Sequence, residues 1–205
     1  MSASMTNDGF QGLLALGYEQ RGAEFKGPGS LTDSHFAAKV TRAVLAMANR
    51  RGGGTVIIGV EDKKSALEAV GLTDSQLRSW KHDDIADKLA TYADPYVSFD
   101  QEEFEFEERK FVILRVHEFE EIPVLCKRQF DTVLRKGACY VRSVNKAESA
   151  EVATQEDMRE LIELATEKRL RRFVAQARAA GLDVSGGSRV SDATLFDDQL
   201  GAFLQ

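Results

Sequence analysis

Cysteine is scarce in this sequence, whose 205 residues include only Cys126 and Cys139. Neither belongs to a Cys-x-x-Cys motif, so we interpret both as reduced, buried side chains of a cytoplasmic protein. The three histidines share no metal-ligand spacing, which argues against a zinc centre. No segment approaches the ~18 consecutive apolar residues of a membrane span. Residues 1–8 also lack the apolar core of a signal peptide.

Positive charge is also in deficit, since 27 Lys and Arg stand against 33 Asp and Glu and give a net charge of −6. A protein that binds nucleic acid non-specifically over its whole surface would be basic. The composition therefore excludes that class but remains compatible with a local basic groove. The apolar share of 43% is sufficient for a hydrophobic core, and the length suits one sizeable domain with an appendage.

The hydrophobic pattern predicts an α/β fold of the α+β type, with a mixed β-sheet flanked by helices. Residues 55–60 are apolar throughout, which indicates a central strand covered on both faces. Helical patterns cover residues 9–16, 32–49, 74–93 and 154–180. Strand patterns cover residues 24–26, 55–60, 66–72, 96–106, 110–118, 123–127, 132–136 and 139–143.

We expect three parts along the chain: a domain over residues 1–150, a helix within 151–182, and a linker with an amphipathic tail over 183–205. The tail segment 191–204 has an apolar side and an acidic side. Five exposed large apolar groups would favour association, so we predict a homo-oligomer or a protein partner that binds through 191–204. The alternative is that the tail folds back onto its own domain. The large apolar residues of this segment are Leu195, Phe196, Leu200, Phe203 and Leu204.

Two acidic motifs are candidates for a catalytic metal site. Glu19, Glu24 and Lys26 lie in one short run, and Asp62, with Glu61 as its alternative, follows the apolar strand. Carboxylates are the ligands that Mg²⁺ and Mn²⁺ prefer, and a bound cation polarises a phosphoryl oxygen. We predict a site for Mg²⁺ or Mn²⁺ made by Glu19, Glu24 and Asp62, with Lys26 orienting the nucleophile or stabilising charge. The alternative is that these are solvated surface side chains.

A glycine-rich turn over residues 52–54 precedes the apolar strand, and Arg50 and Arg51 precede the turn. Its N–H groups suit a phosphate, and the two arginines add positive charge. The turn lacks the Lys-Ser/Thr ending of a P-loop and opens a strand rather than a helix. The alternative is structural, because glycines also end a helix and allow a tight entry into a strand.

A second basic group lies in the later strands. Arg135, Lys136 and Arg142, with Tyr140 between them, suit phosphate contacts and base stacking. The alternative is a solvated face of the sheet.

The order of these motifs resembles the Schlafen AlbA-type domain, in particular that of bacterial Schlafen-like proteins. The resemblance covers residues 16–150. It consists of Glu-x4-Glu-Phe-Lys from Glu19, Ala-x-Ala-Asn-x-x-Gly-Gly-Gly from Ala46, Gly-Val-x-Asp ending at Asp62, and Tyr-Val-Arg ending at Arg142. Gln20 stands where the family commonly has a serine.

The resemblance implies a nucleic-acid-binding domain, and we expect RNA rather than DNA as its ligand. In animal Schlafens a three-carboxylate site cleaves structured RNA such as tRNA, and by position the three acids here would be Glu19, Glu24 and Asp62 or Glu61. Bacterial relatives are described as DNA-binding regulators, defence proteins or ATP-binding proteins. We therefore expect a metal-dependent endoribonuclease. The alternatives are a non-catalytic DNA-binding regulator or partner-binding module, and a nucleotide binder.

Overall fold

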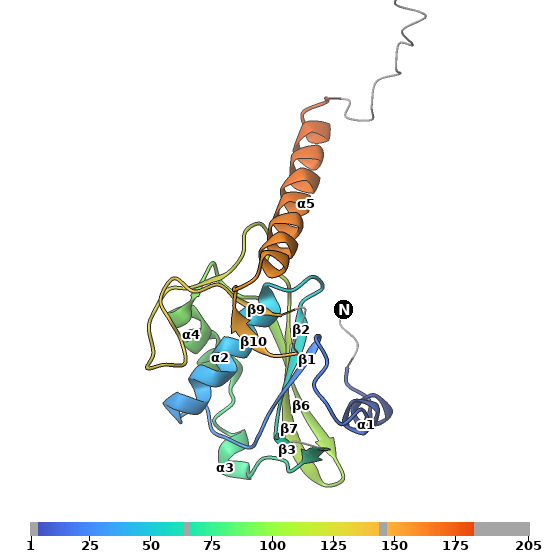
Figure 1. The fold of residues 1–205 in the computed structure, drawn as a ribbon. Helices are drawn as coiled ribbons and strands as arrows, with labels where there is room; N and C mark the ends of the chain where they lie inside the picture. Colours follow the sequence, from blue (N-terminus) through green and yellow to red (C-terminus); the bar gives the residue numbers. More distant parts are fainter. Residues whose placement is uncertain (1–3, 64–65, 144–146, 183–205) are drawn as a thin grey trace, which may run out of the picture. The chain divides into compact units, whose positions relative to one another are not determined.

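A mixed four-stranded sheet organises the structure (Figure 1), which is a computed structural model describing residues 4–63, 66–143 and 147–182. The strand order is β1–β2–β7–β6, with β1 parallel to β2 and the other two pairs antiparallel. This mixed sheet with flanking helices confirms the predicted fold class, and the apolar strand β2 is central as expected. The strands are β1 (Ala23–Lys26), β2 (Gly54–Ile58), β7 (Arg109–Val116) and β6 (Phe99–Phe106).

Helix α2 (Ser34–Ala48) contributes more buried residues than α1, α3 or α4. It begins at Asp33, whose carboxylate accepts hydrogen bonds from the N–H groups of His35 at 2.9 Å and Phe36 at 3.1 Å. Such a cap satisfies donors that the first turn leaves without helical partners. Ten residues of α2 are buried, and nine of them, all except Thr41, share one core with Val56 and Ile58 of β2.

The other sheet face packs against α1 (Asn7–Ala15). Phe10 of α1 is fully buried, and its ring centroid lies 5.1 Å from Phe104, 5.1 Å from Phe106 and 4.9 Å from Phe111. Tilted ring contacts at these distances stabilise a core beyond simple burial. The sheet therefore separates two apolar cores, and Figure 1 shows α1 and α2 on its two sides.

One predicted helix is wrong as a single element, because residues 74–93 form α3 (Asp74–Leu77) and α4 (His82–Tyr92). The break lies at Trp80, which is only 1% exposed. Its indole N–H donates to the carbonyl of Gly29 at 3.0 Å, and its own carbonyl accepts from the side chain of Gln101 at 2.6 Å. These tertiary contacts fix Trp80 outside a helical path.

The predicted strand over 132–136 is also wrong. Residues 131–133 form a turn in which Asp131 has φ +43°, and Phe130 and Leu134 meet in an isolated bridge. Three two-stranded pairs accompany the main sheet. They join β3 (Val60–Lys63) to β4 (Ala66–Ala69), β5 (Ala93–Asp94) to β8 (Leu125–Cys126), and β9 (Tyr140–Arg142) to β10 (Ser149–Glu151).

The last helix, α5, spans Gln155–Ala179. Thr154 caps this helix, since its hydroxyl accepts from the N–H of Asp157 at 3.1 Å. The chain divides into two compact units, one up to Ala165 and one from Thr166. The predicted parts 1–150 and 151–182 stay a prediction, and the tail 183–205 lies outside the described residues. Among the helices described, none has the length and apolarity to span a membrane.

Candidate functional site

Strand β1 places an acid inside the protein. Side chains alternate between the faces of a strand, so Glu24 and Lys26 lie opposite Phe25. Phe25 enters the core that contains Phe10, while Glu24 is directed to the other face and is only 3% exposed. A buried carboxylate needs charged or hydrogen-bonding partners, and Glu24 has three.

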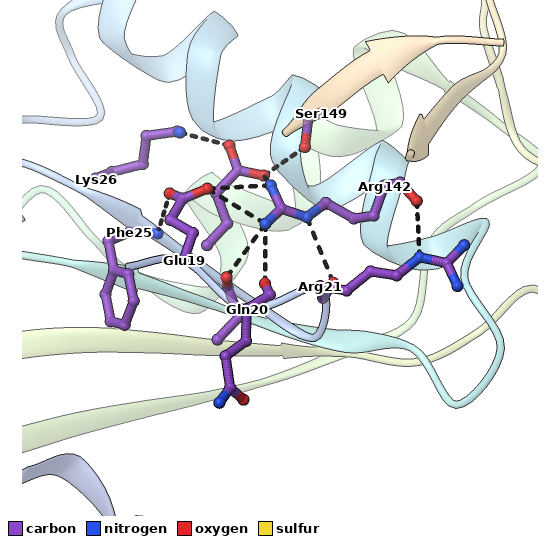
Figure 2. Close-up of polar contacts among 9 residues, drawn as sticks. Glu19, Gln20, Arg21, Phe25, Lys26, Arg142 and Ser149 are labelled. Carbon is purple, nitrogen blue, oxygen red and sulfur yellow. Dashed lines mark hydrogen bonds and ion pairs between the residues drawn. The ribbon is translucent and has the colours of Figure 1, made fainter. Parts of the chain in front are cut away.

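Arg142 of β9 is the principal partner of Glu24 (Figure 2). Its side chain is fully buried. Its Nη1 donates to Oε2 of Glu24 at 2.9 Å, and both Nη1 and Nη2 donate to Oε2 of Glu19, at 3.3 and 3.2 Å. Charge-assisted hydrogen bonds of this kind are stronger than neutral ones. The first two predicted acids therefore do converge, and the group between them is a guanidinium.

The same guanidinium also binds the backbone of the segment that joins the two acids. It donates to the carbonyl oxygens of Gln20 at 3.0 Å, Ala23 at 3.3 Å and Arg21 at 3.4 Å. Figure 2 shows the amide of Gln20 directed away from Arg142, so this residue contributes its backbone alone. The arginine thus fixes residues 19–23 as well as the two carboxylates.

Lys26 and Ser149 complete this group. Lys26 Nζ lies 2.5 Å from Oε1 of Glu24, and the hydroxyl of Ser149 donates to Oε2 of the same carboxylate. Oε1 of Glu19 accepts from the N–H of Phe25 at 2.9 Å. We call Glu19, Glu24, Lys26, Arg142 and Ser149 the carboxylate cluster.

The formal charges of the carboxylate cluster cancel, since two carboxylates face one guanidinium and one ammonium. The balance does not remove the cost of burial. Burial raises the pKa of the Glu19 carboxyl above its ordinary value; the Phe25 hydrogen bond opposes this shift and the Glu24 carboxylate adds to it.

The third predicted acid lies on another strand. Asp62 is exposed on β3, and Glu61 is half-buried beside Gly27, where a Cβ would lie 3.3 Å from its Cγ. Within the described part of the chain, no group of three or more His, Cys, Asp or Glu side chains is placed to hold a metal ion. The oxygens of Glu24 are already bound by Lys26, Arg142 and Ser149, so as arranged these residues do not fit a divalent cation.

The glycine turn between α2 and β2 has a clear structural role. Gly52 and Gly53 have φ of +77° and +68°, a region that glycine adopts without strain. A Cβ at Gly53 would overlap the carbonyl oxygen of Val116. The N–H of Gly52 donates to the carboxylate of Glu118 at 2.7 Å. An anionic group of the chain itself thus binds where we predicted that a phosphate would.

Arg50 holds this turn, since its Nη1 donates to the carbonyls of Gly53 at 2.6 Å and Arg51 at 3.1 Å. Its guanidinium carbon would lie 3.5 Å from a Cβ at Gly22, beside Arg21. Burial lowers the pKa of Arg50, and the positive charge of Arg21 lowers it further. Arg21, Arg50 and Arg51 form what we call the arginine corner.

The second predicted basic group is not one continuous surface. The ring of Tyr140 is buried at 3% exposure, and its hydroxyl accepts from the N–H of Arg135 at 2.8 Å, so it offers no face for base stacking. Arg142 is buried in the carboxylate cluster and is not a surface phosphate contact. Arg135 is exposed and pairs with Glu151, which it contacts at 2.9 Å, and Lys136 is exposed.

Sequence reasoning missed two residues of this region. Ser149 lies on β10, a short strand with no apolar pattern to predict it. Arg21 lies between the two glutamates in the chain; it donates to the carbonyl of Arg142 at 3.1 Å and pairs with Glu160 of α5. Its position between Glu19 and Glu24 could have marked it as a candidate site residue. Its partners, however, are distant in sequence.

A comparison with known protein families shows to which family this chain belongs. Residues 19–151 match the model described as "Schlafen, AlbA_2". The chain belongs to this Schlafen AlbA_2 family. The matched region begins at Glu19 and ends at Glu151, so it contains the whole carboxylate cluster and the arginine corner.

Two solved structures are similar to this family member. The DIP2311 protein from Corynebacterium diphtheriae is 18% identical with a TM-score of 0.49, and the match covers 74% of this chain and 27% of that chain. The N-terminal domain of a RecG-related protein from Nitrosomonas europaea is 20% identical with a TM-score of 0.46, covering 63% and 86%. No curated protein matches the chain.

Proposed function

We propose that residues 19–151 form a nucleic-acid-binding domain. The observation that carries this proposal is the family match over those residues, which includes the carboxylate cluster and the arginine corner. The net charge of −6 means that attraction to phosphates must come from a local group of cations.

The arginine corner is the surface that we propose for phosphate contacts. Arg21 lies close enough to Arg50 for its positive charge to lower the pKa of Arg50, and Arg51 is exposed and follows Arg50 in the chain. Arginine forms planar, two-pronged hydrogen bonds to phosphate oxygens. The N–H of Gly52 donates to the carboxylate of Glu118, and this contact supports an affinity of the turn for oxyanions. We propose that Lys136 and Arg135 contribute more weakly to phosphate binding. The charge of Arg135 is already balanced by its ion pair with Glu151.

Binding is tested by fluorescence anisotropy with single-stranded RNA, tRNA, and single-stranded and duplex DNA, each over a range of salt concentrations. The double variant Arg50→Ala, Arg51→Ala should weaken binding to all sequences alike. It should also flatten the log–log salt dependence by about two units if each arginine makes one phosphate contact.

The matched control is Arg78→Ala, Lys81→Ala, which removes the same charge from exposed residues beside α3 and α4. This control should retain affinity and salt slope within error. If the salt dependence of affinity is unchanged in the Arg50→Ala, Arg51→Ala variant, the arginine corner is not part of the binding surface. The ratio of RNA to DNA affinity decides between an RNA-binding domain and a DNA-binding regulator.

The catalytic form of the proposal is metal-dependent cleavage of tRNA-like RNA by Glu19, Glu24 and Asp62, with Lys26 assisting and Mg²⁺ or Mn²⁺ as cofactor. The convergence of Glu19 and Glu24 beside Lys26 favours it. It requires the two carboxylates to give up their present partners. Incubation with tRNA in Mn²⁺ or EDTA tests it: EDTA-sensitive cleavage that is lost in Glu24→Gln and Asp62→Asn would support it.

A further inference from the structure

We propose that Arg142 is the built-in cation of an oxygen cage, and that this cage accepts a divalent cation only when the arginine side chain is removed. The family resemblance implies a metal between Glu19 and Glu24, whereas the structure places a guanidinium there. The inference concerns the identity of the cation that these acids hold.

Within the described residues, each hydrogen bond of the guanidinium goes to an oxygen atom. Its three nitrogens contact carboxylate oxygens of Glu19 and Glu24 and the carbonyl oxygens of Gln20, Arg21 and Ala23, at 2.9 to 3.4 Å. Carboxylate and carbonyl oxygens are also the ligand types that bind Ca²⁺, Mg²⁺ and Mn²⁺. Truncation of Arg142 would leave a buried space bordered by these oxygens. One of them, Oε2 of Glu24, would still accept the hydrogen bond from the hydroxyl of Ser149.

Charge explains why the intact cage has no need of a metal ion. Arg142 and Lys26 together balance Glu19 and Glu24, and an added divalent cation would bring two uncompensated positive charges into a site whose arginine is fully buried. Buried unpaired charge is strongly unfavourable. Without Arg142 the two carboxylates would keep only Lys26, and a cation would then reduce their repulsion.

The cage also connects parts of the fold that share no strand pairing. The β9–β10 pair is separate from the four-stranded sheet that contains β1. Arg142 of β9 and Ser149 of β10 both bind Glu24 of β1, and Arg142 holds the loop from Glu19 to Ala23. Arg142 is therefore a positioning residue for the whole acidic motif.

The test uses the full chain and two probes, methylguanidinium and Mn²⁺, without nucleic acid. Thermal unfolding measures stability. Electron paramagnetic resonance measures free Mn²⁺, and the difference from the total gives the number of bound ions. In the wild type, Mn²⁺ should stay free and the melting temperature should not change. Arg142→Ala should melt roughly 10 °C lower, as expected when one partner of a buried ion pair is lost. Millimolar methylguanidinium or Mn²⁺ should then raise its melting temperature.

Arg135→Ala is the matched control, because it removes an exposed arginine from an ion pair with Glu151 and should respond to neither probe. If Arg142→Ala does not fold, Arg142→Lys keeps the charge without the forked donors, and should be destabilised yet still exclude Mn²⁺. Binding of about one Mn²⁺ per wild-type chain that Glu24→Gln abolishes would overturn the proposal. An unchanged melting temperature in Arg142→Ala would overturn it equally. Neither result depends on nucleic-acid binding, so the binding proposal is tested separately. The metal-dependent catalytic form is the opposing hypothesis, because it requires the intact cluster to bind Mg²⁺ or Mn²⁺.

Discussion

Glu19 makes the stability of the folded protein depend on pH. Its pKa is raised in the folded protein, chiefly by burial, so between about 4.5 and that raised pKa the folded state binds more protons than the unfolded state. Within this window the contribution of Glu19 to stability decreases as pH rises, and the full cost of the buried charge is present above the raised pKa.

Glu19→Gln should remove this contribution to the pH dependence. The difference in free energy of unfolding between Glu19→Gln and wild type should shift in favour of the variant as pH rises from about 4.5, because the amide cannot ionise. Urea unfolding between pH 4.5 and 7 measures both curves. Parallel curves for the two proteins would show that the Glu19 pKa is the same in the folded and unfolded states.

At this scale the sequence predicted the residues but not all of their partners. Glu19, Glu24 and Lys26 were identified from local spacing, and the structure brings them together. Arg142 was predicted as a surface contact, yet it binds Glu24 from 118 positions further along the chain. No local pattern carries such information, because a buried arginine and an exposed one look alike in a short strand.

Among the elements, the turn from α2 into β2 allows a paired comparison of two glycines. Gly52 and Gly53 both have positive φ, but only Gly53 has a backbone atom where a Cβ would stand. Gly52→Ala should cost about 1 kcal/mol, the strain of a left-handed residue. Gly53→Ala should cost more than twice as much, because β7 or the turn must also shift.

Chemical denaturation of both variants checks this prediction, with the slope m monitored for loss of two-state unfolding. Equal destabilisation by the two alanines would mean that the turn adapts without disturbing Val116. If Gly53→Ala also loses nucleic-acid affinity at temperatures where it is folded, the arginine corner depends on the path of this turn.

Elements defined by local periodicity were predictable, whereas those set by distant contacts were not. Helix α2 and the β6–β7 pair follow apolar patterns that are visible within a few turns or alternations. The break at Trp80 depends on Gly29 and Gln101, and the turn at Asp131 depends on a left-handed backbone angle. Propensity alone does not show where tertiary hydrogen bonds replace helical ones.

For the whole molecule, the tail remains a matter of prediction. Residues 191–204 lie outside the described part, and we propose that their apolar side docks on a second copy or a protein partner. Truncation after Leu182 should lower the oligomeric mass measured by light scattering and leave the melting temperature nearly unchanged. An unchanged mass with a melting temperature several degrees lower would show instead that the tail folds onto its own domain.

Trp80 gives the molecule an optical reporter of its own. It is the single tryptophan of the chain, and it belongs to the core that contains α2, with 1% exposure and an indole N–H that donates to Gly29. Its fluorescence emission should therefore be blue-shifted in the folded protein and move to longer wavelength when water reaches the ring. Because α1 packs on the opposite side of the sheet, a signal from Trp80 and a far-ultraviolet signal from all helices would coincide only if both cores melt together.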